Sequence, residues 1–440
     1  RLSNVMLDYI NGSNAAIMFF NTRSAILQTI SSINFVNWGF NNPVAAGKAM
    51  LNQPQFWKDF GKLINSDYLQ DRRNGLRLNI AESEIADAAA TSRNKAKAAL
   101  RYIQQKGYLP TQYADSFAIA FGGATYYRNR INDLIKNEGK TLEQAEKQAL
   151  SEWREISEES QQSSDASKIS AQQSSDAGRL ILMFGNTPMQ YARIQKRAFQ
   201  DLINGRGDAK TNAGKIAYYA FVQNLIFNGL QQAMFAVGFG DGDSDAADKK
   251  KMDIANGMLD SQLRGLGMAG VAVSVAKNFL KDLYDRSKRS KPDYADAIYK
   301  LLQFSPPISS KLSRIRGAAW QFDSKQRRQE MFDKGFSLDN PAYRAGAKVL
   351  SATTNIPLDR MFSKYDNIKA AMQEENDWWM SVAELAGWPE WQLKPKKNKS
   401  KESKVKKNKK TNVRGNVTLK PRDVKINSRV TKKNKVYLYK

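Results

Sequence analysis

The residues best suited to bind another molecule are the cations near the end of the chain. Residues 394–440 hold 19 Lys and Arg against two acids, Glu402 and Asp423. Such a lysine-rich segment cannot bury a core, and a flexible polycation binds polyanions by releasing their counterions. No motif in it reads base sequence, so we expect non-specific contact with DNA; a targeting or solubilising tail is the alternative. The cations expected to make the contact are Lys396, Lys397, Lys399, Lys404, Lys406, Lys407, Lys409, Lys410 and Arg414.

A second candidate surface lies within residues 216–240, which contain no charged side chain over 25 positions. Asn224, Asn228, Gln231 and Gln232 recur there at the spacing that places them on one face of a helix. The segment exceeds the roughly 20 residues with which a helix spans a bilayer. Two interpretations stay open: a buried central helix, or a helix whose amide face contacts a membrane or lines a pore in another state.

The side chains that most enzymes use for catalysis are missing. The chain has no Cys and no His. Disulfides, thiolate metal sites and cysteine nucleophiles are therefore excluded, together with the commonest general base and metal ligand. Catalysis would have to use carboxylates, Lys, Tyr or a Ser with a Lys base. We predict that the chain is not an enzyme and has no catalytic residue, metal or cofactor.

Two ligand-binding motifs are incomplete. Residues 265–270 spell GxGxxG, but no buried strand precedes them. Small residues that let helices approach closely explain this motif better than a nucleotide site. Asp241, Asp243 and Asp245 begin a calcium-loop pattern that lacks its Gly and its final Glu, so a solvated acidic turn is the simpler interpretation.

One group of carboxylates is spaced for acid–base work. Glu155, Glu158 and Glu159 lie close together, and Glu159-Ser160 resembles the Glu-Ser pair of lysozyme-like transglycosylases. The other marks of that family are missing, so a solvated helical face is favoured. Four aromatic residues before the tail have three interpretations: they stack on bases, lie at a membrane interface, or anchor a helix to the core. The acids around them favour the anchored helix, because carboxylates repel phosphates and anionic lipids. The four aromatic residues are Trp378, Trp379, Trp388 and Trp391.

Helices are the elements expected to position all of these residues. Thr141 and Gln144 form a capping box, Gly107 is placed to end a helix, and no period-2 alternation in the body is long enough to require a sheet. An N-cap residue followed by Pro recurs at Asn42-Pro43, Thr187-Pro188 and Asn340-Pro341, and Gln53-Pro54 is placed to start another short helix. The predicted fold is mainly α: an irregular multi-helix body with a long hydrophobic helical hairpin and a basic C-terminal tail that carries short strands.

Changes in composition predict three regions. Residues 1–205 form an N-terminal helical region, and residues 206–393 a second helical region with a Trp-rich end. The hairpin lies within the second region at about 216–280, with residues 216–240 packing against about 258–280. Residues 394–440 form the basic low-complexity tail, and alternating pieces after Gly415 can pair as strands on a partner.

A family resemblance covers residues 153–240. Its marks are the sequence Gln-Gln-Ser-Ser at 161–164 and again at 172–175, the sequence Asn-Thr-Pro-Met-Gln at 186–190, the turn at 204–208 and the uncharged helix. This stretch resembles the C-terminal region of very large virion proteins of tailed bacteriophages, of the polyvalent or ejection type. The start at Arg1 rather than Met fits a piece of such a long chain.

The resemblance implies an internal virion protein that is packaged in the capsid and ejected with DNA to help genome delivery across the host envelope. Its partners would be portal or inner capsid proteins, packaged DNA, further copies of itself and, conditionally, a membrane. It would reside in the virion interior and then in the host periplasm or inner membrane. The alternatives are a structural component that is never ejected and, third, a peptidoglycan-cleaving enzyme fragment. No catalytic residues carry over.

Overall fold

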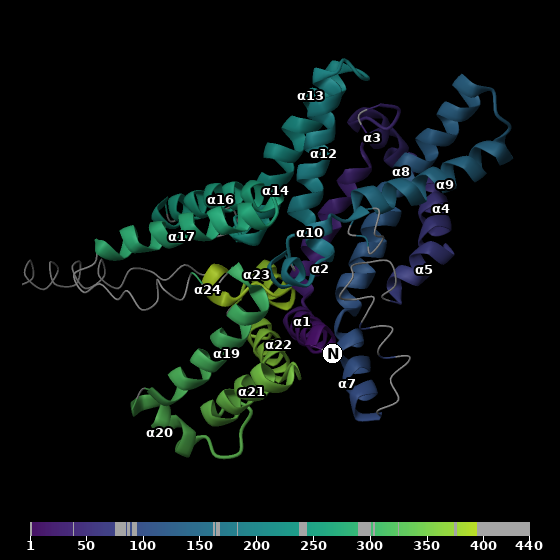
Figure 1. The fold of residues 1–440 in the computed structure, drawn as a ribbon. Coiled ribbons are helices and arrows are strands. Elements are labelled where there is room, and N and C mark those ends of the chain that lie inside the picture. The colour runs from purple at the N-terminus through teal and green to yellow at the C-terminus, as the bar shows by residue number, and fades with distance from the viewer. Residues whose placement is uncertain are drawn as a thin grey trace, which may run out of the picture. The chain divides into compact units, whose positions relative to one another are not determined.

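A computed structural model of the chain describes residues 2–37, 39–74, 85, 89, 95–161, 163, 168–182, 184–236, 244–288, 301, 304–323, 325–373 and 376–393. All of these residues belong to one compact unit, Arg1–Leu393. Across the described ranges every regular element is a helix, which confirms the mainly helical fold (Figure 1). The nine predicted tail cations and the short strands predicted after Gly415 lie outside these ranges.

The helices of the first half are α1 (Leu2–Met18), α2 (Thr22–Thr29), η1 (Ile30–Phe35), α3 (Pro43–Leu51), α4 (Gln53–Ile64), α5 (Asp67–Arg73), α7 (Lys95–Gly107), α8 (Leu109–Glu138), α9 (Leu142–Ser160), α10 (Ala171–Ser174), α11 (Asp176–Leu182) and α12 (Asn186–Ile203). Those of the second half are α13 (Ala209–Ala217), η3 (Tyr218–Val222), α14 (Gln223–Gln231), α16 (Ser244–Gly265), α17 (Met268–Ser287), α19 (Pro306–Asp323), α20 (Lys325–Asp333), α21 (Pro341–Thr354), α22 (Leu358–Ala371), α23 (Trp378–Leu385) and α24 (Glu390–Leu393). The helices α12 and α13 pack against each other across the predicted limit at residue 206.

The helix α8 is the centre of the largest apolar core. It contacts α2, η1, α3, α4, α5 and α9, and the core joins Phe35, Leu63, Ile119 and Trp153 among others. Two glycines of α8 make these contacts close: a Cβ on Gly122 would lie 2.0 Å from the Ser32 carbonyl oxygen, and one on Gly123 would lie 2.1 Å from the Trp153 indole nitrogen. Small residues in α8 therefore set how near its neighbours lie.

Most predicted helix ends are confirmed. Asn42 and Asn340 accept hydrogen bonds from backbone N–H groups of the helices that begin at Pro43 and Pro341. The capping box at Thr141 is present, α4 begins at Gln53 and α7 ends at Gly107. The predicted cap at Thr187 is wrong, because α12 begins at Asn186 with Gly185 as its N-cap.

The predicted hydrophobic hairpin is not supported as drawn. Its first arm is three elements, α13, the π-helical turn η3 and α14, and the helix ends at Gln231. Its second arm is broken at Gly267, where φ is +78°. The hairpin that forms instead joins α16 and α17, which lie side by side (Figure 1). No described helix meets the length and apolarity that a membrane span requires.

Contacts from the Trp-rich end and from α16 hold the break after Gln231 in place. The Trp388 indole donates to the Leu230 carbonyl at 3.0 Å, and the Lys250 ammonium donates to the Ala233 carbonyl at 2.9 Å. Ala233 adopts φ +52°, a left-handed conformation that is costly for a residue with a Cβ. Trp388 is buried and Trp379 packs partly on the same cluster, whereas Trp378 and Trp391 are exposed, so the anchor interpretation holds for two of the four.

Two ion pairs tie α8 and α4 to α9. The Arg130 Nε lies 2.6 Å from Glu152, and the Lys62 ammonium lies 2.9 Å from Glu146. Burial alone would raise the pKa of Glu152, but hydrogen bonds led by that from Arg130 outweigh it and hold the pKa below its ordinary value. The hydrogen bond from Lys62 likewise lowers the pKa of Glu146.

These pKa shifts predict that acid destabilises this part of the fold. A carboxylate with a depressed folded-state pKa stabilises the protein above its ordinary pKa of 4.5, and loses that contribution as the pH falls through the folded value. Glu152→Gln should therefore reduce the difference in unfolding free energy between neutral and acid pH by about 1 kcal/mol or less. Urea unfolding of the two chains at neutral and at acid pH measures this. Glu155→Gln, at an exposed site on the same helix, is the matched control; an equal effect there would contradict the assignment.

Candidate functional site

All four amides of the predicted stripe line one cavity of about 550 Å³. One wall comes from α1, α2 and the start of α8, and the other from α12, α14 and α16. Residues 186–188, part of the motif that carries the phage resemblance, also line it. The sequence patterns therefore converge in the fold on a single internal space.

The stripe amides at the centre of α14 are buried and hydrogen-bonded. The Asn224 Nδ2 donates to the Met258 carbonyl of α16 at 3.1 Å, and the Asn228 Nδ2 donates to the Asn224 Oδ1 at 2.9 Å. Gly257 allows this approach, because a Cβ there would lie 2.3 Å from the Asn228 Oδ1. A role of the stripe as a membrane or pore face stays a prediction; in this fold the stripe faces the cavity.

Beside the amide stripe, η3 and α14 carry large apolar side chains that are exposed. The exposed fractions of Phe221, Val222 and Leu225 are 66%, 47% and 53%. The helix is thus inverted relative to an ordinary surface helix: Asn224 and Asn228 are buried while these apolar side chains are exposed, and only at its end is a stripe amide, Gln231, exposed as well. We call these three residues the outer apolar face. Contiguous exposed apolar patches larger than roughly a few hundred Å² often mark the places where soluble proteins bind a partner.

An aromatic cluster holds the inverted helix on α12. The π-helical turn η3 buries Tyr218 and Tyr219, and Tyr219 packs on Tyr191 with 5.3 Å between ring centroids. The Gln223 Nε2 donates to the Tyr191 hydroxyl at 2.7 Å. Burial raises the pKa of Tyr191, so this phenol stays neutral and can both accept and donate at the cavity wall.

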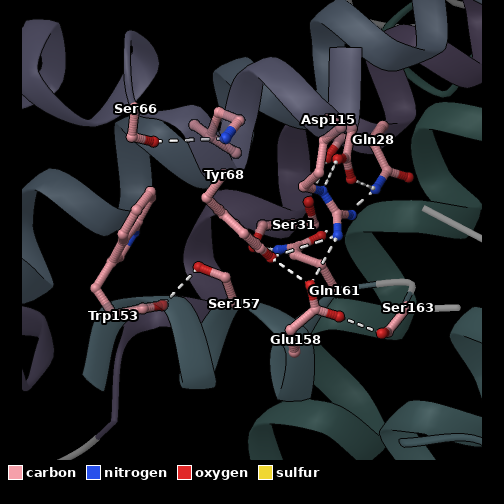
Figure 2. A network of polar contacts seen from close by, with 12 residues as sticks. Gln28, Ser31, Ser66, Tyr68, Asp115, Trp153, Ser157, Glu158, Gln161 and Ser163 are labelled. Carbon is pink, nitrogen blue, oxygen red and sulfur yellow. Dashed lines mark hydrogen bonds and ion pairs between the residues drawn. The ribbon is translucent and has the colours of Figure 1, made fainter. Parts of the chain in front are cut away.

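A buried ionic network lies behind the cavity wall formed by Gln28 and Asp115 (Figure 2). The Arg72 Nε donates to the Asp115 Oδ2 at 2.8 Å, and neither side chain is exposed beyond 1%. The Gln28 Nε2 donates to the other oxygen of Asp115 at 3.0 Å. The Arg72 guanidinium also lies 3.6 Å from Glu158, which accepts from the Tyr68 hydroxyl at 2.9 Å. Four helices, α2, α5, α8 and α9, thus meet at one charge.

The charge of Arg72 dominates this network. Burial alone would lower the pKa of Arg72, but the adjacent carboxylates, first of all Asp115, outweigh it and raise the pKa. Burial raises the pKa of Tyr68 in turn. Both raised pKa values keep Arg72 charged and Tyr68 neutral near neutral pH, so their contacts hold these helices together.

The motif residues of the phage resemblance connect segments of the chain. The Gln161 Nε2 donates to the Ser31 carbonyl, and the Gln190 Nε2 donates to the Gln161 carbonyl, both at 3.0 Å. The Gln173 Nε2 donates to the Asn186 Oδ1 at 2.8 Å. In the part of the chain that the structure describes, these glutamines therefore join the segment after α9 to η1 and to α12.

The remaining candidates have the following surroundings. Glu158 belongs to the Arg72 network, whereas Glu159 lies 3.4 Å from Lys168 and 3.7 Å from Arg197. Of the GxGxxG glycines, Gly265 ends α16, Gly267 lies in the turn and Gly270 lies within α17, so a helix and not a strand precedes the motif, as expected.

The calcium-loop pattern falls partly outside the described ranges, which end before Asp241 and resume at Ser244. Within those ranges no three acidic side chains are grouped so as to hold a metal ion.

Sequence patterns missed the ionic network and the far wall of the cavity. One signal was present: Gln112, Asp115 and Ser116 place polar side chains on one face of a helix that is otherwise rich in apolar residues, and all three are buried. Arg72 carried no such signal, because it lies in a short run of charged residues typical of a surface helix.

The Arg72 network predicts a large effect of removing one partner. Asp115→Leu leaves the guanidinium buried beside Glu158 alone, and should lower the free energy of unfolding by about 3–5 kcal/mol. Arg72→Met combined with Asp115→Leu removes both charges and should recover most of that loss. Urea denaturation of the three chains measures it. Equal stability of the single and the double variant would contradict the proposed pairing.

The inverted helix predicts opposite effects on its two faces. Phe221→Ser with Leu225→Ser should change the free energy of unfolding by less than about 0.5 kcal/mol per site, because both side chains lie outside. Asn228→Leu should lower the free energy of unfolding by about 1–3 kcal/mol, because it leaves buried polar groups of α14 without a hydrogen-bond partner. Thermal and urea unfolding compare the two. If the serine pair were the more destabilising change, the outward orientation would be wrong.

In comparisons with protein-family models, with curated proteins and with solved structures, nothing matches the chain.

Proposed function

We propose that this chain is an internal virion protein of a tailed bacteriophage, packaged in the capsid and ejected with the DNA to help genome delivery across the host envelope. The observation that carries the proposal is the outer apolar face of η3 and α14, which is exposed in the single chain. Covering one large apolar side chain contributes about 1.5–3 kcal/mol before the costs of association. In the proposal a portal or inner capsid protein, or another copy of the chain, covers this face.

The basic tail supports contact with packaged DNA. Its 19 cations stand in a segment of 47 residues with only two acids. Counterion release makes such contact strong at low salt and independent of base sequence, which suits a protein stored against tightly packed DNA. The cations named above, from Lys396 to Arg414, are its proposed contacts.

Conditional membrane contact is the finer part of the proposal. In the folded chain α14 ends at Gln231, where Trp388 and Lys250 bind the carbonyls of Leu230 and Ala233. Release of these two contacts would let the uncharged segment extend toward the roughly 20 residues that a bilayer requires. Delivery would then couple loss of the Trp-rich anchor to exposure of the apolar segment in the host periplasm or inner membrane.

A structural component that is never ejected is the second candidate. The Arg72 network favours it, because a fully buried charge at which four helices meet resists the partial unfolding that passage through a narrow portal requires. The third candidate, a peptidoglycan-cleaving fragment, finds less support, because both Glu158 and Glu159 are engaged by cations.

Mass spectrometry of purified virions before and after genome release tests the proposal. We expect the peptides of this chain in intact particles and their loss from emptied ones. Phe221→Ser with Leu225→Ser should lower the packaged amount severalfold, whereas the matched exposed pair Leu51→Ser with Trp57→Ser, on α3 and α4, should not. Retention of the chain in emptied particles would favour the structural component, and its absence from particles would refute both.

A further inference from the structure

The helices α14, α16 and α17 lie side by side in one layer, with α16 in the middle (Figure 1). The Gln262 Nε2 of α16 donates to the Ala220 carbonyl of η3 at 3.2 Å, and the Ser274 hydroxyl of α17 donates to Asp260 of α16 at 2.7 Å. One side of this layer faces the body of the chain, because α14 and α16 line the cavity and Val275 of α17 is buried in an apolar cluster with α11 and α12. The layer therefore has a second, outer side, turned away from these contacts.

The outer side of α16 is apolar. Met252, Ala255 and Leu259 share one arc of the helix, and all three are exposed. This arc lies between the residues that contact α14 and those that contact α17, and none of the residues that line the cavity falls on it. The middle helix of the layer thus turns its polar side chains toward the cavity and apolar ones away from it.

The outer side of α17 continues this surface. Val273 and Leu280 are seven residues apart and share one face, across the helix from the buried Val271 and Val275. Together with Leu266 in the turn before α17, the apolar residues of α16 and the outer apolar face of η3 and α14, they form what we call the three-helix face. Its large side chains, each between 47% and 69% exposed, are Phe221, Val222, Leu225, Met252, Leu259, Leu266, Val273 and Leu280.

The three-helix face is large for a single chain. Neighbouring helices lie about 8–10 Å apart, so exposed side chains on one side of the layer join into one surface. At this exposure each of the eight large side chains shows on the order of 100 Å², which gives roughly 800 Å² in all. The largest apolar patch of a monomeric protein is usually about 300–600 Å², whereas each partner of a standard interface covers about 800 Å². The face therefore has the size of one side of a stable protein interface.

The charge of these helices favours a second copy of the chain as the occupant. The chain has a net charge of +26, so most of its surface repels another copy. The helices of this face differ, because η3 and α14 contain no charged residue, and α16 and α17 together contain seven cations and six carboxylates. Two copies can therefore meet here without net repulsion, whereas DNA or an anionic lipid surface gains no net attraction.

We propose that a second copy of this chain covers the three-helix face, in a twofold-symmetric dimer that buries the same face of both copies. Twofold pairing suits this face because each copy brings the same apolar layer to the contact. With α16 in the middle of each layer, its outer residues lie near the symmetry axis. The inference deepens the proposed function and rests on its premise that the outer apolar face is covered; it names the partner as a second copy.

Sedimentation equilibrium of the full chain tests the pairing, at high salt so that contacts of the basic tail are screened. We expect a mass twice that of the chain. Leu259→Ser with Leu280→Ser should raise the dimer dissociation constant at least about a hundredfold, because each substitution acts twice in a symmetric pair. The matched control is Leu142→Ser with Leu338→Ser, at sites 56% and 55% exposed outside the face, and it should leave the constant unchanged. Equal helical content by circular dichroism shows that both variants fold.

A single cysteine gives a second measurement that removes no large apolar side chain. The chain contains no Cys, so a short bismaleimide can join a thiol placed at the exposed Ala255 only to the same position of another copy. We expect Ala255→Cys to be crosslinked into a dimer at low protein concentration. Thr353→Cys, at an exposed site on α21, is the control and should remain a single chain under the same conditions.

Three results would overturn the dimer. The first is a chain that sediments as a monomer at every concentration. The second is a dimer that Leu259→Ser with Leu280→Ser leaves intact, which would place the contact on another surface. The third is a monomer that floats with neutral phospholipid vesicles and loses this binding in the same variant, which would make a membrane the occupant. A dimer that is absent from virions would refute only the proposed function, and a monomer that is packaged in virions would refute only the dimer.

Discussion

The positive charge of Arg72 lies where water does not reach, and the arrangement of four helices follows from the need to neutralise it. Asp115 of α8, Glu158 of α9 and, through Asp115, Gln28 of α2 all converge on this guanidinium of α5. Such a buried pair adds little net stability compared with apolar packing, but an arrangement that separates its partners is very costly. We infer that the pair selects one register among helices whose apolar faces alone would allow several.

The need of buried polar groups for hydrogen-bond partners also explains the inverted helix. Once Asn224 and Asn228 are inside, each must find partners, and α16 supplies one of them through the Met258 carbonyl. Facing these amides inward leaves Phe221, Val222 and Leu225 no place but the outside. An apolar outer face is therefore a consequence of an amide-lined interior, and it gives the chain a surface that suits association.

The Trp-rich end contributes to where the helix in the uncharged segment ends. Trp388 packs against Ala233 and Ala236, and its indole and the Lys250 ammonium bind carbonyls that an intact helix would bind itself. The segment is thereby divided between a helix over the cavity and a turn held by distant residues. In the proposed function these few contacts separate the stored form of the chain from one that meets a membrane.

Local sequence patterns were enough to predict the helical fold class and most helix ends, because a cap such as Asn42 or Thr141 binds backbone groups only a few residues away. They also placed the four stripe amides on one face, since helix periodicity is local. Which face of this helix is buried depends on its packing partners, because a helix without charged residues carries no local signal of which face meets water. The partners Arg72 and Asp115 are 43 residues apart, and Gln28 and Asp115 are 87 apart. Burial of polar groups depends on such distant partners, and no pattern within a single helix specifies them.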